Sequence, residues 1–137
     1  PFLGARPGGS WSKSRLDEAT KQIVAGQVVS HEEAIRKLRA SSTWRTPQTA
    51  TDLALTIKWT AQALQNAHPL GVGKWVAYEA VQELVRTGKH TLTRLEDSDN
   101  TYRMWAKSPI GPHGWSVLLQ FEMPKRTLYV CDIKQGI

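Results

Sequence analysis

The chain has 137 residues, a net charge of +6 at pH 7 and a pI near 9.7. Its length suffices for one domain with its own core, and no apolar run reaches the ~20 residues of a membrane span. One cysteine excludes an internal disulfide, and one cysteine with four histidines does not suggest a zinc site, so we expect no metal and no cofactor.

The first segment, residues 1–14, contains three glycines and two prolines and shows little periodicity. We expect a linker or a loosely docked arm. Because the chain begins with proline, we also expect an excised domain or a processed product. Residues 15–137 are then expected to form a single domain, with a helical half (15–88) and a sheet half (89–137).

Four helices are predicted in the helical half, over residues 15–27, 30–40, 47–66 and 74–87. Ser30 and Glu33 form a capping box at the start of the second helix. Pro47 suits the first position of the third helix, and Gly88 suits the end of the fourth. Residues 68–73 are predicted to be a turn between helices, since their glycines fit no phosphate-loop spacing.

Four short strands are predicted in the sheet half, over residues 90–96, 101–107, 115–122 and 127–134. The segments between them have turn compositions, and connections this short favour an antiparallel meander. We therefore predict an α+β fold in which the N-terminal helices pack on one face of a four-stranded antiparallel sheet. The other face would be left to solvent or to a ligand.

Period-two spacing separates the two faces of these strands. Trp115, Val117, Leu119 and Phe121 share one face, which is the expected core face. On the second strand, the face opposite Tyr102, Met104 and Ala106 presents two bases with an aromatic residue between them: Arg103, Trp105 and Lys107. A basic surface with an aromatic side chain is typical of RNA binding.

A family resemblance rests on the last two strands. Residues 114–122 (GWSVLLQFE) and 125–134 (KRTLYVCDIK) resemble the last hairpin of RelE- and ParE-type toxins. The order of helices followed by a meander is similar to the wider group of small microbial ribonucleases that spans barnase, EndoU, the tRNA-cleaving colicins and RelE. The chain departs from RelE-type proteins in its four-helix N-terminal half, which is longer than theirs, and it lacks a complete EndoU-like set of two histidines and a lysine at recognisable motifs.

The resemblance implies a metal-independent endoribonuclease of the kind found as bacterial toxin effector domains. It also implies RNA as substrate, a 2′,3′-cyclic phosphate product and an acidic immunity or antitoxin protein as partner. Such a domain would be delivered from a larger secreted protein and would act in the cytoplasm of the target cell.

Metal-free RNA cleavage needs a general base, a general acid and cations that stabilise the charged transition state. Histidine suits both proton roles because its pKa is near neutrality. The candidate catalytic residues are His113, His90, Arg103, Lys107 and Tyr129. The candidate substrate-binding residues are Arg94, Trp105, Lys125, Arg126 and Lys134.

Two other classes stay open. A non-catalytic RNA-binding domain would use the same basic and aromatic face, or the basic end of the second helix at Arg36, Lys37 and Arg39. A protein-interaction domain would instead use an apolar surface, and its charge would serve solubility.

Overall fold

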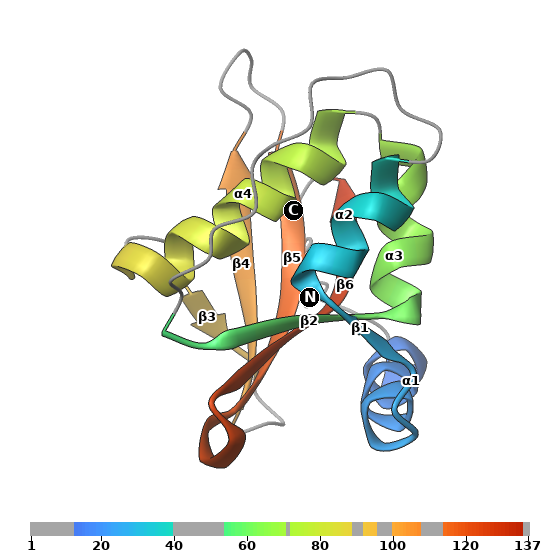
Figure 1. Ribbon diagram of the computed structural model, residues 1–137, viewed down its shortest axis with the longest axis vertical. Coiled ribbons are helices and arrows are strands. Elements are labelled where there is room, and N and C mark those ends of the chain that lie inside the picture. The colour runs from blue at the N-terminus through green and yellow to red at the C-terminus, as the bar shows by residue number, and fades with distance from the viewer. Residues whose placement is uncertain are drawn as a thin grey trace, which may run out of the picture.

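The computed structural model describes residues 13–39, 54–70, 72–88, 92–95, 100–107 and 114–135. Within these ranges it has an α+β fold with four α-helices and a six-stranded mixed sheet (Figure 1). The α-helices are α1 (Lys13–Val24), α2 (His31–Arg39), α3 (Ala61–Ala67) and α4 (Val72–Thr87). The strands are β1 (Val28–Ser30), β2 (Thr56–Thr60), β3 (Leu92–Arg94), β4 (Thr101–Lys107), β5 (Gly114–Glu122) and β6 (Thr127–Gln135). Short 3-10 turns, η1 (His68–Leu70) and η2 (Met123–Lys125), follow α3 and β5.

The sheet has the strand order β1-β2-β6-β5-β4-β3. Strands β3 to β6 form an antiparallel meander, in agreement with the predicted connections. The predicted sheet was nevertheless too small, because β2 pairs parallel with β6 and β1 pairs antiparallel with β2. The α+β class is confirmed, whereas the purely antiparallel, four-stranded sheet is wrong.

The missing strand β2 lies inside the segment predicted as the third helix. Residues 56–60 alternate, with Ile57 and Trp59 buried and Thr56 exposed, and they are rich in β-branched and aromatic residues that favour strands. Pairing with β6 satisfies the backbone of this segment, so tertiary contacts override the helical spacing. Residues 61–67 are helical as predicted, and residues 47–53 lie outside the described ranges.

The other described helices agree with the sequence. The hydroxyl of Ser30 accepts a hydrogen bond from the Glu33 amide at 3.1 Å, as a capping box requires. Gly88 ends α4 with a φ of 69° and donates its N–H to the Leu84 carbonyl. The short strand β1, just before α2, was not predicted.

The main core lies between the sheet and the helices α2, α3 and α4. Val117 and Leu119 of β5 are fully buried there, together with Tyr78 and Val81 of α4. Trp115 belongs to the same cluster, and Phe121 packs at its margin. The predicted core face of β5 is therefore correct, and Figure 1 shows α4 lying across this face of the sheet.

The opposite face of the sheet is partly covered by α1. Leu118 and Cys131 point away from the main core and form a second cluster with Ala19 of α1. The prediction that all helices lie on one face is therefore wrong, because α1 carries an apolar stripe that finds its partner on the far side. The same face also holds the basic residues of β4, Arg103 and Lys107.

A buried histidine fixes the junction between α2, β2 and α4. The indole N–H of Trp59 donates to Nδ1 of His31 at 2.9 Å, and Nε2 lies 3.0 Å from Oε1 of Gln82. Because an indole nitrogen can only donate, Nδ1 must be unprotonated, and Nε2 carries the proton and donates to Gln82. The imidazole stacks on Tyr78 at a centroid distance of 3.8 Å, and burial lowers its pKa to about 4.

Candidate nucleic-acid interface

The basic side chains of β4 lie on the face opposite the main core. Arg103 and Trp105 are half-buried and Lys107 is exposed, whereas Met104 and Ala106 between them are fully buried against the helices. This alternation is the one that their spacing predicts. It brings Arg103, Trp105 and Lys107 to one surface.

The register of the sheet adds a lysine to this surface. Trp105 pairs with Ser116, which in turn pairs with Lys134 of β6. Residues paired across strands share a face, and their Cβ atoms lie about 5 Å apart. We call Arg103, Trp105, Lys107 and Lys134 the cationic face.

The indole of Trp105 is seated over the start of β5. A Cβ atom added at Gly114 would collide with the six-membered ring of Trp105. Glycine at this position therefore allows the ring to lie close to the backbone of β5. The half-buried indole is therefore held against β5, and its remaining surface can meet a planar ligand.

A buried aspartate organises the other end of the surface. In the row next to Trp105, Arg103 pairs with Leu118 and Leu118 with Asp132, whose side chain has no exposed surface. Nε of Arg15, from α1, lies 2.9 Å from Oδ2 of Asp132, and Nη2 donates to Oδ1 at 3.3 Å. Oδ1 also accepts from the Asn66 amide of α3 and from the backbone N–H of Ile133, both at 2.8 Å.

Sequence reasoning missed Arg15, Asn66 and Asp132. Asp132 sits in an otherwise apolar strand, VCDI, and a lone acid in such a strand is a signal for a buried partner of opposite charge. That signal does not name the partner, because Arg15 is 117 positions away and reaches it only through the packing of α1.

The cations of this region act on one another. Burial lowers the pKa of Lys134, the positive charges of Arg15 and Arg103 lower it further, and the charge of Asp132 opposes them. Arg15, Arg103 and Lys134 thus lie close enough for their charges to interact, although they come from α1, β4 and β6. Such crowding of like charges is relieved when an anion binds.

Several predicted site residues lie elsewhere. Arg94 pairs with Tyr102 and so lies on the face opposite Arg103. Tyr129 is 6% exposed and belongs to the cluster beneath α1, where burial raises the pKa of its hydroxyl. Lys125 and Arg126 lie at the exposed tip of the β5–β6 hairpin, roughly 26 Å along β6 from Lys134 at 3.3 Å per residue.

Both candidate catalytic histidines, His90 and His113, lie outside the described residues. His113 directly precedes Gly114 in the sequence, and Gly114 pairs with Lys107. Lys107, the last described residue before the segment that contains His113, belongs to the cationic face, and Gly114 is the first described residue after it.

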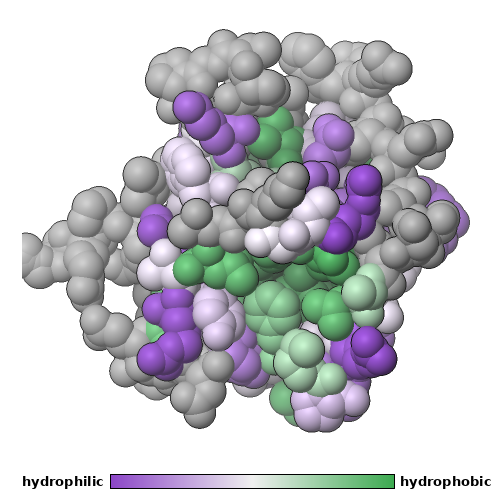
Figure 2. Space-filling model, turned by 90° about the vertical axis from the view of Figure 1, so that its left-hand side faces the viewer, coloured by the Kyte–Doolittle hydropathy of each residue, from purple (hydrophilic) through white to green (hydrophobic). Residues whose placement is uncertain are grey.

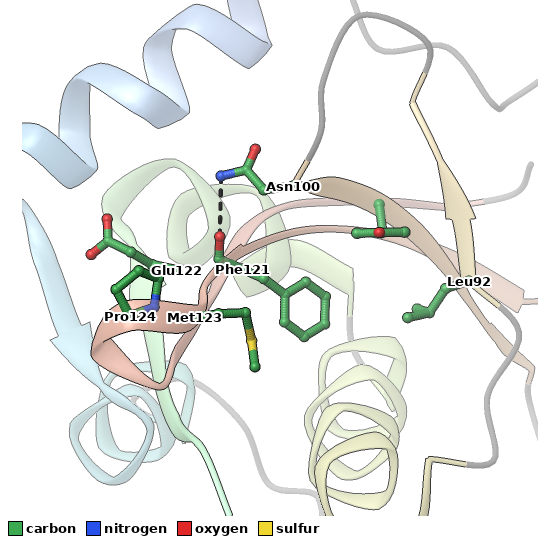
Figure 3. A pocket seen from close by; sticks show the side chains of 7 residues that line it. Leu92, Asn100, Phe121, Glu122, Met123 and Pro124 are labelled. Carbon is green, nitrogen blue, oxygen red and sulfur yellow. Dashed lines mark hydrogen bonds between the residues drawn. The ribbon is translucent and has the colours of Figure 1, made fainter.

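An apolar hollow of about 530 Å³ lies on the other face of the sheet, beyond the area that α4 covers. It is lined by Leu92, Asn100, Tyr102, Phe121, Glu122, Met123 and Pro124. Figure 3 shows Leu92, Phe121 and Met123 around its interior, with Asn100 donating to the Phe121 carbonyl at 3.1 Å. Figure 2 shows hydrophobic side chains gathered between hydrophilic ones on the side of the molecule where β3 lies.

Comparison with family models, with curated proteins and with solved structures finds no significant match to this chain. Within the described ranges, no three acidic, histidine or cysteine side chains come together as a metal site. None of the described helices combines the length and the apolar character that crossing a bilayer requires.

Proposed function

We propose that this chain is an endoribonuclease domain that binds single-stranded RNA on the cationic face. The observation that carries the proposal is that Arg103, Lys107 and Lys134 share one face of the sheet with Trp105. Lysine and arginine contact RNA phosphates, and an aromatic ring stacks on unpaired bases. The C-terminal antiparallel meander and the resemblance of the β5–β6 hairpin to RelE- and ParE-type toxins support the same class.

The proposed reaction is an intramolecular transesterification. A general base removes the proton of a 2′-hydroxyl, whose oxygen attacks the adjacent phosphorus. The bond to the 5′-oxygen breaks, and a general acid protonates that oxygen, which leaves a 2′,3′-cyclic phosphate and a 5′-hydroxyl. His113 and His90 are the proposed proton-transfer groups, and the cations of the cationic face stabilise the extra negative charge on the phosphorane.

RNA cleavage in the presence of EDTA tests the proposal. The purified chain is incubated with a labelled single-stranded RNA and with bulk tRNA, and the product ends are analysed for cyclic phosphate. Replacement His113→Ala is expected to lower the cleavage rate by ~10²–10⁴-fold while RNA binding persists. The matched control is His68→Ala, which changes an exposed histidine of η1.

The outcomes separate the classes. Full activity of the His113→Ala protein would remove this residue from the mechanism and direct attention to His90. RNA binding that weakens steeply with salt, without cleavage by the wild type, would select a non-catalytic RNA-binding domain. Absence of both binding and cleavage would overturn the RNA proposal.

A protein-interaction domain is the second candidate, and the apolar hollow is the observation that favours it. The proposed partner is an acidic protein of the immunity or antitoxin kind, which complements the net charge of +6 and inserts an apolar side chain beside Met123. Met123 is 59% exposed, so Met123→Asp leaves the core intact. The variant is expected to lose this partner, whereas Gln135→Asp, at the exposed end of β6, keeps it.

A further inference from the structure

We infer that Arg15, Arg103 and Lys134 together bind a single phosphate group, and that Asp132 is the positioning residue that holds Arg15 in this site. The inference deepens the proposed function, on which it rests for the assignment of that phosphate to RNA. The site itself is defined by the contacts of Asp132 with α1 and α3 and by the sheet register that places Arg103 on the same face, whatever molecule carries the phosphate.

The orientation of Arg15 is the first step. Asp132 engages one edge of the guanidinium, through Nε at 2.9 Å and Nη2 at 3.3 Å. Because the guanidinium is planar, its Nη1 corner is directed away from the carboxylate. The Arg15 side chain is 38% exposed, whereas that of Asp132 is fully buried. The buried carboxylate therefore fixes the guanidinium at a position where part of it contacts solvent.

The saturation of Asp132 is the second step. Its two oxygens receive the Arg15 guanidinium, the Asn66 amide and the Ile133 N–H, which belong to α1, α3 and β6. These donors from three elements hold the carboxylate in an orientation that faces Arg15. Within the described residues, no ion pair of Arg103 is present.

The proximity of the three cations is the third step. The positive charges of Arg15 and Arg103 act on Lys134, so the three side chains lie near one another at this end of the sheet face. A phosphate group carries one or two negative charges and spreads its oxygens tetrahedrally, so three cations from three elements can each contact it. Arginine binds phosphate in a bidentate manner, and lysine acts as a point charge beside it.

Inorganic phosphate and pyrophosphate are the probes for this site. Their affinities are measured by titration calorimetry and by the rise in melting temperature, against sodium chloride at matched ionic strength. Arg103→Gln and Lys134→Gln change partly exposed side chains and are expected to weaken pyrophosphate binding by about tenfold or more each. Arg86→Gln removes a positive charge from an exposed position on α4, and this control is expected to bind pyrophosphate as the wild type does.

Asp132→Asn distinguishes a positioning role from a simple charge effect. Removing a negative charge near an anion site strengthens anion binding if charge alone matters. If Asp132 positions Arg15, the variant instead binds pyrophosphate more weakly. Should this variant fail to fold, Arg15→Lys replaces it, because lysine keeps the charge but cannot make the two-point attachment; weaker binding is again expected.

Two results would overturn the inference. One is stabilisation by phosphate no greater than that by chloride; the other is equal affinity in the site variants and the control. Cleavage assays on the same proteins distinguish the failure of the phosphate site from the failure of the proposed ribonuclease function. Phosphate binding by a wild type that cleaves no RNA would leave the site intact and remove the proposed function, whereas RNA cleavage without phosphate binding would remove only the site.

Discussion

Burial of the polar side chains of His31 and Asp132 is unfavourable unless they are hydrogen-bonded, and the two residues are stabilised in different ways. His31 is held neutral by a donor on one ring nitrogen and an acceptor on the other. Asp132 is paired with Arg15 and receives further hydrogen bonds from Asn66 and the Ile133 amide. The first arrangement serves packing alone, whereas the second places a cation at the surface.

The free energy of unfolding is expected to fall between pH 7 and pH 5 because of His31. Its pKa is about 4 in the folded state and near 6.5 in the unfolded state, so the unfolded chain binds more protons in this interval. Stability therefore falls as pH decreases, by about 2 kcal/mol for this group. Urea titrations at the two pH values measure the change.

The control for this effect is His31→Gln. This variant is expected to be less stable at pH 7, because it lacks the stacking of the imidazole on Tyr78. Its free energy of unfolding is expected to change much less between pH 7 and pH 5 than that of the wild type. An unchanged pH dependence in the variant would assign the effect to other groups.

Charge removal at Arg103 and Lys107 is expected to change how RNA affinity depends on salt. Each phosphate contact that a variant can no longer make lowers the slope of log affinity against log salt by about one unit. Fluorescence anisotropy with a labelled single-stranded RNA, from low to high salt, measures this slope for Arg103→Gln and Lys107→Gln. If both slopes equal that of the wild type while Lys37→Gln lowers it, the RNA-binding surface would lie on α2 instead.

At the scale of elements, Thr60 marks the change from strand to helix. Its hydroxyl donates to the Cys131 carbonyl of β6 at 3.0 Å and accepts from the Ala63 amide of α3 at 3.1 Å. One side chain thus joins the end of β2 to its neighbour in the sheet and also caps the following helix. This junction places Asn66 beside β6, within reach of Asp132.

Thr60→Val is expected to lower the free energy of unfolding by about 1–3 kcal/mol. The substitution keeps the shape of the side chain but removes the helix cap and a buried hydrogen bond. Thr56→Val, an exposed position of the same strand, is the matched control and is expected to change stability by less than ~0.5 kcal/mol. Equal effects of the two changes in chemical denaturation would contradict this role of Thr60.

Leu119→Ala is expected to lower the free energy of unfolding by about 2–5 kcal/mol, because this side chain of β5 is fully buried against the helices. Phe121→Ala is expected to cost less, since Phe121 is half-exposed at the margin of the core and lines the hollow. Thermal and urea unfolding measure both. An unfolding midpoint that barely moved in the Leu119 variant would show that this is not the core face.

At the scale of the whole molecule, the sheet has two differently covered faces. Of the described helices, α4 crosses one face, which also carries the apolar hollow, and α1 packs on the other face, which also carries the cationic face. The two areas differ in chemistry, because one is apolar and the other is basic. They lie on opposite sides of one sheet.

Local patterns in the sequence determined much of this architecture. Apolar residues at helical spacing, the Ser30 cap and Gly88 specified α1, α2 and α4, and period-two alternation specified β4, β5 and their two faces. These features depend on residues within a few positions of one another, so the sequence alone predicts them. The common surface of Arg103, Trp105 and Lys107 follows from the same alternation.

Only the tertiary structure decided the parts that depend on distant residues. Residues 56–60 form a strand because β6 offers a parallel partner, and this pairing outweighs a helical pattern that extends into α3. Arg15 and Asn66 meet Asp132 because α1 and α3 pack against β6 from separate parts of the chain. Long-range pairing and packing of this kind leave no local periodicity, so no pattern in the sequence indicated that these residues belong to one site.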